Sequence, residues 1–156
     1  MAKIIKATPE HISSINSVVT AAYTKYIERI GKPPAPMLAD YSQLLKTHDV
    51  FVLQDADATS TSAVLGSIIL KSDDESDSIK VNNLVVDPAL QGRGYGRLLM
   101  DFAEERARGQ RRSALTLFTN VKMYENLGLY AKLGFVETER RVEDGYERVF
   151  FRKALN

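Results

Sequence analysis

The residues best suited to chemistry lie near the middle of the chain, where three glycines alternate with other residues. Residues 91–97 read Gln-Gly-Arg-Gly-Tyr-Gly-Arg and lie between an apolar run and a segment with helical spacing. Glycine lets a ligand approach the main chain, and the free N–H groups at a helix start attract negative charge. Arg93 and Arg97 add positive charge beside the loop. The stretch favours a cradle for a phosphate-like anion, and the alternative is a glycine-rich turn without a ligand.

Three glycine-loop patterns were compared with this stretch. A P-loop requires Gly-Lys followed by Ser or Thr, whereas Gly96 is followed by Arg97. A dinucleotide fingerprint requires G-x-G-x-x-G, and neither Gly92 nor Gly94 begins such a spacing. The third pattern, Q-x-x-G-x-G, is met by Gln91, Gly94 and Gly96.

The composition narrows the class of protein. At 156 residues the chain can bury a sizeable core, and we expect a single domain over residues 1–156. The formal net charge is +1, so no overall field would recruit nucleic acid or an anionic membrane. Cysteine is absent, which excludes disulfides, thiolate metal sites and cysteine nucleophiles, and we expect no metal. The first ten residues lack the apolar core of a signal peptide, so the cytoplasm is the expected location.

The hydrophobic pattern predicts the elements that must position the loop. Strands are expected at residues 3–7, 49–56, 63–72, 79–87, 113–120, 135–142 and 146–155. Helices are expected after the N-cap Thr8, over residues 37–46, from residues 94–97 onward, and over residues 123–134. The side chains expected to face inward on the second and third helices are Leu38, Tyr41, Leu44, Leu45, Leu98, Leu99, Phe102 and Ala103. The order β-α-α-β-β-β-α-β-α-β-β predicts a mixed sheet with helices on both faces.

Two segments of the chain resemble a known superfamily. Residues 84–100, LVVDPALQGRGYGRLLM, resemble the acetyl-CoA motif of the GNAT superfamily of N-acetyltransferases, and residues 125–135, ENLGLYAKLGF, resemble its second motif. The resemblance implies an α/β fold with a central mixed, mostly antiparallel sheet flanked by helices. It also implies transfer of the acetyl group of acetyl-CoA to a primary amine of a small molecule or peptide. Direct transfer is favoured because no cysteine could hold the acetyl group.

The resemblance implies a role for the loop and for the strand before it. The pyrophosphate of CoA would lie on the loop, and the pantetheine arm would bond to the main chain of that strand. In the superfamily this strand carries a bulge and separates from the next strand, and a main-chain N–H near Val85 would polarise the thioester carbonyl. The implied cofactor-binding residues are Leu84, Val85, Val86, Gln91, Gly92, Arg93, Gly94, Tyr95, Gly96, Arg97 and Asn126.

Tyr130 is the implied catalytic residue. It lies four residues after Asn126, on the same helical face. In the resembling superfamily the tyrosine hydroxyl lies near the sulfur of CoA and would donate a proton to the leaving thiolate. The alternative is a core aromatic, because Leu127 and Leu133 flank Tyr130 on the same side.

No general base is evident. Many superfamily members use a glutamate on the strand before the loop, but residues 79–83 read Ile-Lys-Val-Asn-Asn. Asn83 could orient a water but cannot be the base. His11 and His48 are expected to be exposed.

The resemblance implies an acceptor site built from the first two helices, their connection and the last strand pair. The candidate acceptor-binding residues are Tyr26, Glu28, Asp40, Tyr41 and Asn83, with Tyr146 and Arg148 as further candidates. A rigid surface connection with solvated charges is the alternative interpretation of residues 23–41.

A non-catalytic CoA-binding sensor or partner protein is the alternative to an enzyme, because the strand carboxylate is missing. The arginines at 106, 108, 111 and 112 would lie at a helix C-terminus, where cations are favoured, or near the adenosine phosphate of CoA. A nucleic-acid module is disfavoured. Dimers are common among similar proteins, so the resemblance leaves a homodimer open.

Overall fold

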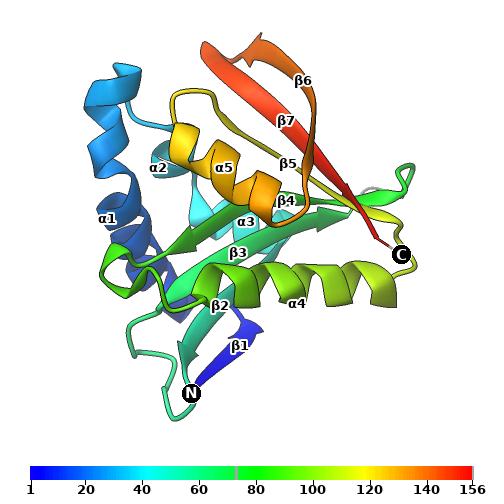
Figure 1. Cartoon of the computed structure of the whole chain (residues 1–156). Coiled ribbons are helices and arrows are strands. Elements are labelled where there is room, and N and C mark those ends of the chain that lie inside the picture. The colour runs from blue at the N-terminus through cyan, green and yellow to red at the C-terminus, as the bar shows by residue number, and fades with distance from the viewer. Residues whose placement is uncertain (73, 156) are drawn as a thin grey trace.

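The computed structural model describes residues 1–72 and 74–155, which form a seven-stranded sheet with helices on both faces (Figure 1). The strands are β1 (Ala2–Lys6), β2 (Asp49–Asp55), β3 (Gly66–Ser72), β4 (Ser78–Val86), β5 (Ala114–Asn120), β6 (Val136–Glu143) and β7 (Tyr146–Ala154). The helices are α1 (Ile12–Ile30), α2 (Ala35–Leu38), α3 (Tyr41–Thr47), α4 (Tyr95–Gly109) and α5 (Tyr124–Lys132). Short 3₁₀ turns, η1 (Pro9–His11) and η2 (Pro88–Leu90), precede α1 and α4.

The sheet is mixed and mostly antiparallel, as the sequence predicts. Its strand order is β1-β2-β3-β4-β5-β7-β6, and β4 and β5 form the parallel pair. The hairpin between β6 and β7 turns at Asp144 and Gly145, which both have positive φ angles, as a tight hairpin turn requires. No helix in the described ranges is long and apolar enough to cross a bilayer.

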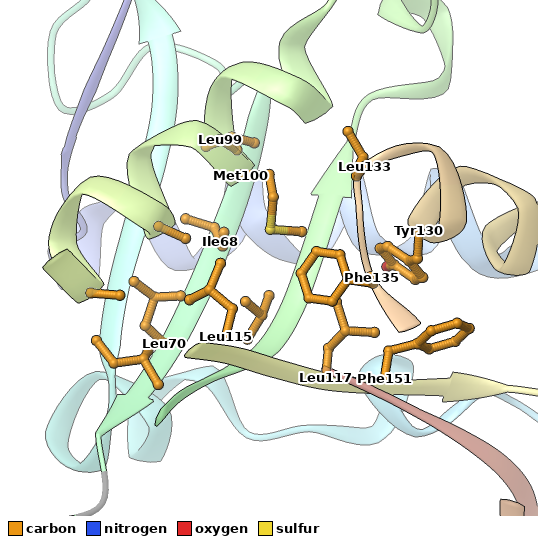
Figure 2. Close-up of a cluster of buried hydrophobic side chains, with 14 of the residues drawn as sticks. Ile68, Leu70, Leu99, Met100, Leu115, Leu117, Tyr130, Leu133, Phe135 and Phe151 are labelled. Atoms are coloured by element: carbon orange, nitrogen blue, oxygen red, sulfur yellow. The ribbon is translucent and has the colours of Figure 1, made fainter. Parts of the chain in front are cut away.

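Two apolar layers cover the two faces of the sheet. On one face, α1 and α3 pack against a cluster that includes Val50, Val52 and Ile69. On the other face, α4 and α5 cover a cluster in which Leu99 and Met100 meet the strand residues and Phe135 (Figure 2). Consecutive residues of β2 and β3 point to opposite faces, and the apolar runs 50–53 and 68–70 are buried throughout, as is typical of strands covered on both sides.

The sheet opens into a wedge between β4 and β5. These strands pair only from Ser78 to Lys80, and beyond that point they separate (Figure 1). On its other edge, β4 stays paired with β3, where Ile69 faces Asn83 and Leu70 faces Val81, so Asn82 is an extra residue in a β-bulge. The bulge and the separation of the strands are therefore confirmed, and they leave the β5-side edge of β4 unpaired.

The predicted second helix is wrong in its bounds. The chain forms α2 and α3 instead, because Ala39 is extended and Asp40 caps α3 by accepting from the Ser42 and Gln43 N–H groups. Leu38 consequently ends α2 on the surface and is 67% exposed, although it was expected to face inward.

Two further burial predictions are wrong. Leu98 is 41% exposed, because the buried stripe of α4 runs through Leu99, Met100 and Ala103. His11, expected to be exposed, is 1% exposed because its Nδ1 accepts a hydrogen bond from the Thr8 N–H and turns the ring inward. His48 is partly buried at the end of α3.

Gly66 lies where β3 and β4 approach each other closely, beside the end of β4. A Cβ on Gly66 would lie 2.7 Å from the Val85 carbonyl oxygen and 3.3 Å from Leu99 Cδ1. We expect Gly66→Ala to lower the free energy of unfolding by about 1–3 kcal/mol, because the strands or the helix must shift. Urea unfolding would measure this. Gly109→Ala, whose Cβ meets open space at the end of α4, is the control and should retain the wild-type stability. Equal unfolding midpoints for Gly66→Ala and the wild type would contradict the close approach.

Candidate active site

The glycine loop joins β4 to α4 in a fixed conformation. Asp87 begins the loop, and its Oδ1 accepts a hydrogen bond from the Ala89 N–H at 3.0 Å. Gly92 and Gly94 have φ angles of 86° and 81°, in the left-handed region that other residues rarely adopt. The backbone itself therefore requires glycine at these two positions.

The first turn of α4 offers free main-chain donors. The Leu98 N–H bonds to the Gly94 carbonyl at 3.0 Å and begins the helix ladder. The capping residue is Gly94, so among the described residues no side chain caps the N–H groups of residues 95–97. A Cβ on Gly96 would meet no atom of the described chain within 4 Å apart from its neighbours and its own helix backbone, and Gly96 has no positive φ. The protein itself does not require glycine at position 96, whereas a ligand lying against the main chain would.

The loop forms one wall of a cavity, here named the loop cleft. The rest of the cavity is lined by residues of β4, α1 and α5. The lining residues from the predicted cofactor set are Leu84, Val85, Val86, Gln91, Gly92, Gly94, Tyr95, Gly96, Arg97 and Asn126. The structure therefore brings this predicted set together around one cavity, except Arg93, which is exposed outside it.

The loop cleft is positively charged. Lys25 of α1, Arg97 of α4 and Lys132 of α5 line it. The lining carboxylate, Glu125, is bound by Arg29 at 2.6 Å, and this interaction holds the pKa of Glu125 below its usual value. Free helix N–H groups and three cations at one cavity are suited to an anionic ligand with several phosphate groups.

A second cavity lies in the wedge between β4 and β5 and is named the wedge pocket. Its walls are β4, β5, the start of α2 and the β7 residues Tyr146 and Arg148. Three residues, Tyr23, Leu84 and Tyr130, line both cavities. A ligand in the loop cleft and a ligand in the wedge pocket would therefore meet beside these residues.

Tyr130 is placed by apolar packing. Its ring lies 5.9 Å from that of Phe135 and 5.8 Å from that of Phe151, measured between centroids (Figure 2). Burial, with a smaller contribution from Tyr26, raises the pKa of Tyr130 to about 12. The hydroxyl makes no hydrogen bond within the described ranges, although both cavities border the residue. Tyr130 is thus both a core aromatic and a protonated group at the junction of the two cavities.

Tyr23 connects α1 to the bulge of β4. Its hydroxyl donates to Asn83 Oδ1 at 3.0 Å, and the Leu84 carbonyl oxygen lies 3.5 Å away. Burial raises the pKa of Tyr23, so the hydroxyl remains a donor at neutral pH. The Asn83 carbonyl oxygen therefore accepts from Tyr23, the Asn83 side chain also interacts with the Tyr41 hydroxyl, and the residue borders the wedge pocket.

The remaining predicted acceptor residues are dispersed. Tyr26 lines the loop cleft instead of the wedge pocket, and Glu28 is an exposed residue of α1 outside both. Asp40 is the cap of α3. Tyr41 is buried and donates to the Pro36 carbonyl at 2.8 Å, and burial raises the pKa of Tyr41 to about 12. Of the further candidates, Tyr146 and Arg148 do line the wedge pocket.

The arginine cluster lies at the wrong end of α4 to reach the loop. Helix α4 has 15 residues, so about 22 Å separates its ends. Arg106 stacks on Phe51 at 4.7 Å, and Arg112 donates to the Ser76 carbonyl at 2.6 Å. Arg106 and Arg112 contact the protein at the C-terminal end of α4, away from the loop cleft.

Several residues that line the two cavities are not among those predicted from the sequence. They are Tyr23, Lys25 and Lys132 on helices, Pro34–Pro36 at α2, and Phe118, Thr119 and Asn120 on β5. A tyrosine at helical spacing, such as Tyr23, reads as core until its hydroxyl partner is known, and Asn83 is 60 residues away. The connection between the first two helices is part of the predicted acceptor site, but its individual prolines are not among the predicted residues.

The family is identified by comparison with known proteins. Residues 46–137 match the model of the acetyltransferase (GNAT) domain, and this match covers more than half of the chain. A mycothiol acetyltransferase of Jonesia denitrificans is 35% identical over 79 residues, which are 51% of this chain and 25% of that protein. The aligned stretch thus spans about a quarter of the length of this curated relative.

Solved structures share the fold over the whole chain. An Escherichia coli N-acetyltransferase that acts on the alanine of a ribosomal protein has a TM-score of 0.75 and 17% identity, with 99% of this chain and 94% of that chain covered. A Bacillus subtilis acetyltransferase in complex with CoA has a TM-score of 0.72 and 17% identity, with 100% of both chains covered. The domain match and the shared mixed sheet show that this chain belongs to the GNAT family of acetyltransferases.

Proposed function

We propose that this protein is an acetyl-CoA-dependent N-acetyltransferase that transfers the acetyl group directly to a primary amine of a small molecule or peptide. The observation that carries the proposal is the meeting of two cavities at Tyr23, Leu84 and Tyr130, one of which has a floor of free helix N–H groups. The names of the relatives, which are acetyltransferases, support the reaction class.

The loop cleft fits a CoA molecule in charge and in main-chain donors. The N–H groups of residues 95–97, with Arg97, Lys25 and Lys132, would hold the phosphates. The unpaired edge of β4 at Leu84–Val86 would bond to the pantetheine arm, and Asn126 borders the same cavity. Acetyl-CoA supplies an acyl group activated as a thioester.

The transfer step requires one bond to form and one to break. The nitrogen of a neutral amine bonds to the carbonyl carbon and the carbon–sulfur bond breaks; the nitrogen releases one proton to water, and Tyr130 gives its proton to the sulfur and regains one from solvent. A main-chain N–H near Val85 would stabilise the negative charge on the carbonyl oxygen during transfer. Tyr130 suits this role because its raised pKa of about 12 keeps it protonated at neutral pH.

In this proposal, solvent water takes the proton from the amine, and no side chain acts as the general base. No carboxylate or histidine within the described ranges lines the wedge pocket, so the amine must arrive neutral or lose its proton to water. For an amine with a pKa of ~10.4, only about 0.04% is neutral at pH 7. The missing carboxylate also supports a second candidate, a CoA-binding protein without turnover.

Initial-rate kinetics should show one ternary complex. Tyr23, Leu84 and Tyr130 border both cavities, so both substrates can be bound together, and no cysteine is present to carry an acetyl group. Double-reciprocal plots against both substrates, with thiol release as the readout, should give intersecting lines. Parallel lines, or a competent acetylated protein detected by mass spectrometry, would disprove direct transfer. Binding of acetyl-CoA by calorimetry without thiol release from any amine would favour the non-catalytic candidate.

A further inference from the structure

We propose that the amine acceptor carries an anionic group, a carboxylate or a phosphate, that pairs with Arg148 in the wedge pocket. This inference rests on the proposed function, because it describes the second substrate of the same site. It begins with the lining of the pocket. Among the described residues the lining contains one formal charge, Arg148, together with the uncharged polar residues Asn82, Asn83, Thr119 and Asn120.

Arg148 is held rigidly and in a defined orientation. It projects from β7, is 9% exposed, and its guanidinium lies 4.2 Å from the centre of the Phe118 ring. Its Nη1 bonds to Glu143 at 3.0 Å and lies 3.5 Å from Asp144 Oδ2. A guanidinium stacked on an aromatic ring and fixed at one nitrogen loses little freedom when it binds a planar anion.

Several N–H donors of Arg148 are not used by its ion pairs. Its two ion pairs both use Nη1. A guanidinium carries five N–H donors, and those on Nη2 and Nε make no hydrogen bond within the described ranges. Both nitrogens, Nη2 and Nε, keep some exposure to the surrounding space. These donors can therefore bind a ligand group in the pocket without breaking the existing ion pairs.

Charged side chains of both signs surround Arg148, with Lys32, Lys80 and Arg141 balanced by Glu139, Glu143 and Asp144. Lys80 of β4 lies 4.6 Å from the centre of the Phe118 ring, and burial followed by the charge of Arg148 lowers the pKa of Lys80. Lys32, after α1, lies 4.2 Å from the Tyr146 ring centre and donates to the Gly145 carbonyl. The charged groups on the elements around the pocket mouth are Lys32, Lys80, Glu139, Arg141, Glu143, Asp144 and Arg148.

The positive charge of Arg148 in the pocket should favour some classes of amine acceptor over others. A polyamine or an aminoglycoside would place its additional ammonium groups near Lys32, Lys80 and Arg148, where Glu143 and Asp144 already pair with Arg148. An amine that also carries a carboxylate or a phosphate would gain charge-assisted hydrogen bonds from Arg148. The same cations disfavour the protonated form of the reacting amine, which lowers its pKa. A cationic pocket without a base is therefore consistent with an acceptor whose amine reacts after losing its proton to water.

The test compares primary amines in matched pairs. One arm pairs amino acids with their carboxamides, and the other pairs aminoalkyl phosphates with the corresponding amino alcohols. For the wild type we expect the anionic member of at least one arm to have kcat/KM about 10- to 100-fold above its neutral partner, the range of one charged hydrogen-bond pair. The arm that shows the preference identifies the anion.

Substitutions at Arg148 test whether this residue causes the preference for the anionic member of each pair. Arg148→Gln should reduce the ratio to about 1, and Arg148→Lys, which keeps the charge but not the planar fork, should recover part of it. Arg152→Gln is the control for a lost charge on the same strand, since Arg152 pairs with Asp77 outside the pocket. That control should keep the wild-type ratio. Acetyl-CoA affinity, measured by calorimetry, should be unchanged in both Arg148 variants.

A binding measurement makes the test independent of turnover. The N-acetylated products of the same pairs are titrated into the CoA-loaded protein, and the anionic product should bind more tightly to the wild type than to Arg148→Gln. Equal kcat/KM and equal product binding within every pair would overturn the inference while leaving the acetyltransferase proposal intact. A higher kcat/KM for polycationic amines than for anionic amines would also overturn the inference and leave the acetyltransferase proposal intact. Thiol release from no amine would instead overturn the proposed function, and the product titration would still decide whether the pocket binds an anion.

Discussion

Replacing Gly96 with valine should reduce the affinity for acetyl-CoA by about 100-fold or more, while the protein stays folded. The N–H groups of residues 95–97 can bind a phosphate only if the phosphate approaches the main chain, and a Cβ branch at Gly96 would occupy that approach. Losing two charged hydrogen bonds of about 1.5 kcal/mol each corresponds to about 100-fold in affinity. Calorimetric titration with acetyl-CoA would measure the loss.

Gly96 is a sharper test than the neighbouring glycines. Gly92 and Gly94 have left-handed backbones, so substitution there strains the loop whether or not a ligand binds. Gly96 is free of this requirement, and beyond its neighbours and its own helix backbone no atom of the described residues lies within 4 Å of its Cβ position. Valine is also a better helix former than glycine, so the variant should be no less stable than the wild type.

Gly109→Val provides the matched control at the other end of α4. It makes the same substitution in the same helix, also in open space, far from the loop. We expect it to bind acetyl-CoA with wild-type affinity. Wild-type affinity in a folded Gly96→Val protein would show that the phosphates do not lie on the first turn of α4.

The local features of the site could be predicted from the sequence, because they depend on residues close together in the chain. The alternation of Gly92, Gly94 and Gly96 before a helical pattern is enough to indicate an open helix start. Tyr130 is placed by the periodicity of α5 and by Gly134, whose φ of 95° ends the segment. The extra residue Asn82 in β4 could be expected only through the resemblance to other proteins, since nothing in the residues themselves marks a bulge.

The acceptor side could not be predicted in the same way, because long-range contacts build it. Tyr23 acquires a role only through Asn83, and Arg148 only through Phe118 and Glu143, which the folded sheet brings to it. Asp40 was read as a pocket residue for its charge, although an aspartate before a short helix also has a local explanation as its cap. Charge alone in a connecting segment therefore says little about a site.

Tyr130→Phe should lower kcat by about ten- to a thousand-fold with little change in acetyl-CoA affinity or melting temperature. The change removes only the hydroxyl, and the ring contacts with Phe135 and Phe151 remain. The Tyr130 pKa of about 12 lies well above the ~8.5 of a thiol, so transfer of the proton to the departing thiolate is uphill and must be assisted by the developing charge. The loss is moderate because a thiolate can also leave unprotonated.

The pH dependence gives a second readout of the same residue. Since the pKa of Tyr130 is raised to about 12, its proton is present throughout the range from pH 6 to 10, and wild-type kcat should show no fall below pH 10 that is due to this group. Tyr130→Ala is the comparison for packing: it should destabilise the protein by about 3–5 kcal/mol through the cavity it leaves. If Tyr130 were only a core residue, Tyr130→Phe would keep full activity. Full kcat in that variant, under conditions where the chemical step limits the rate, would exclude Tyr130 as the proton donor.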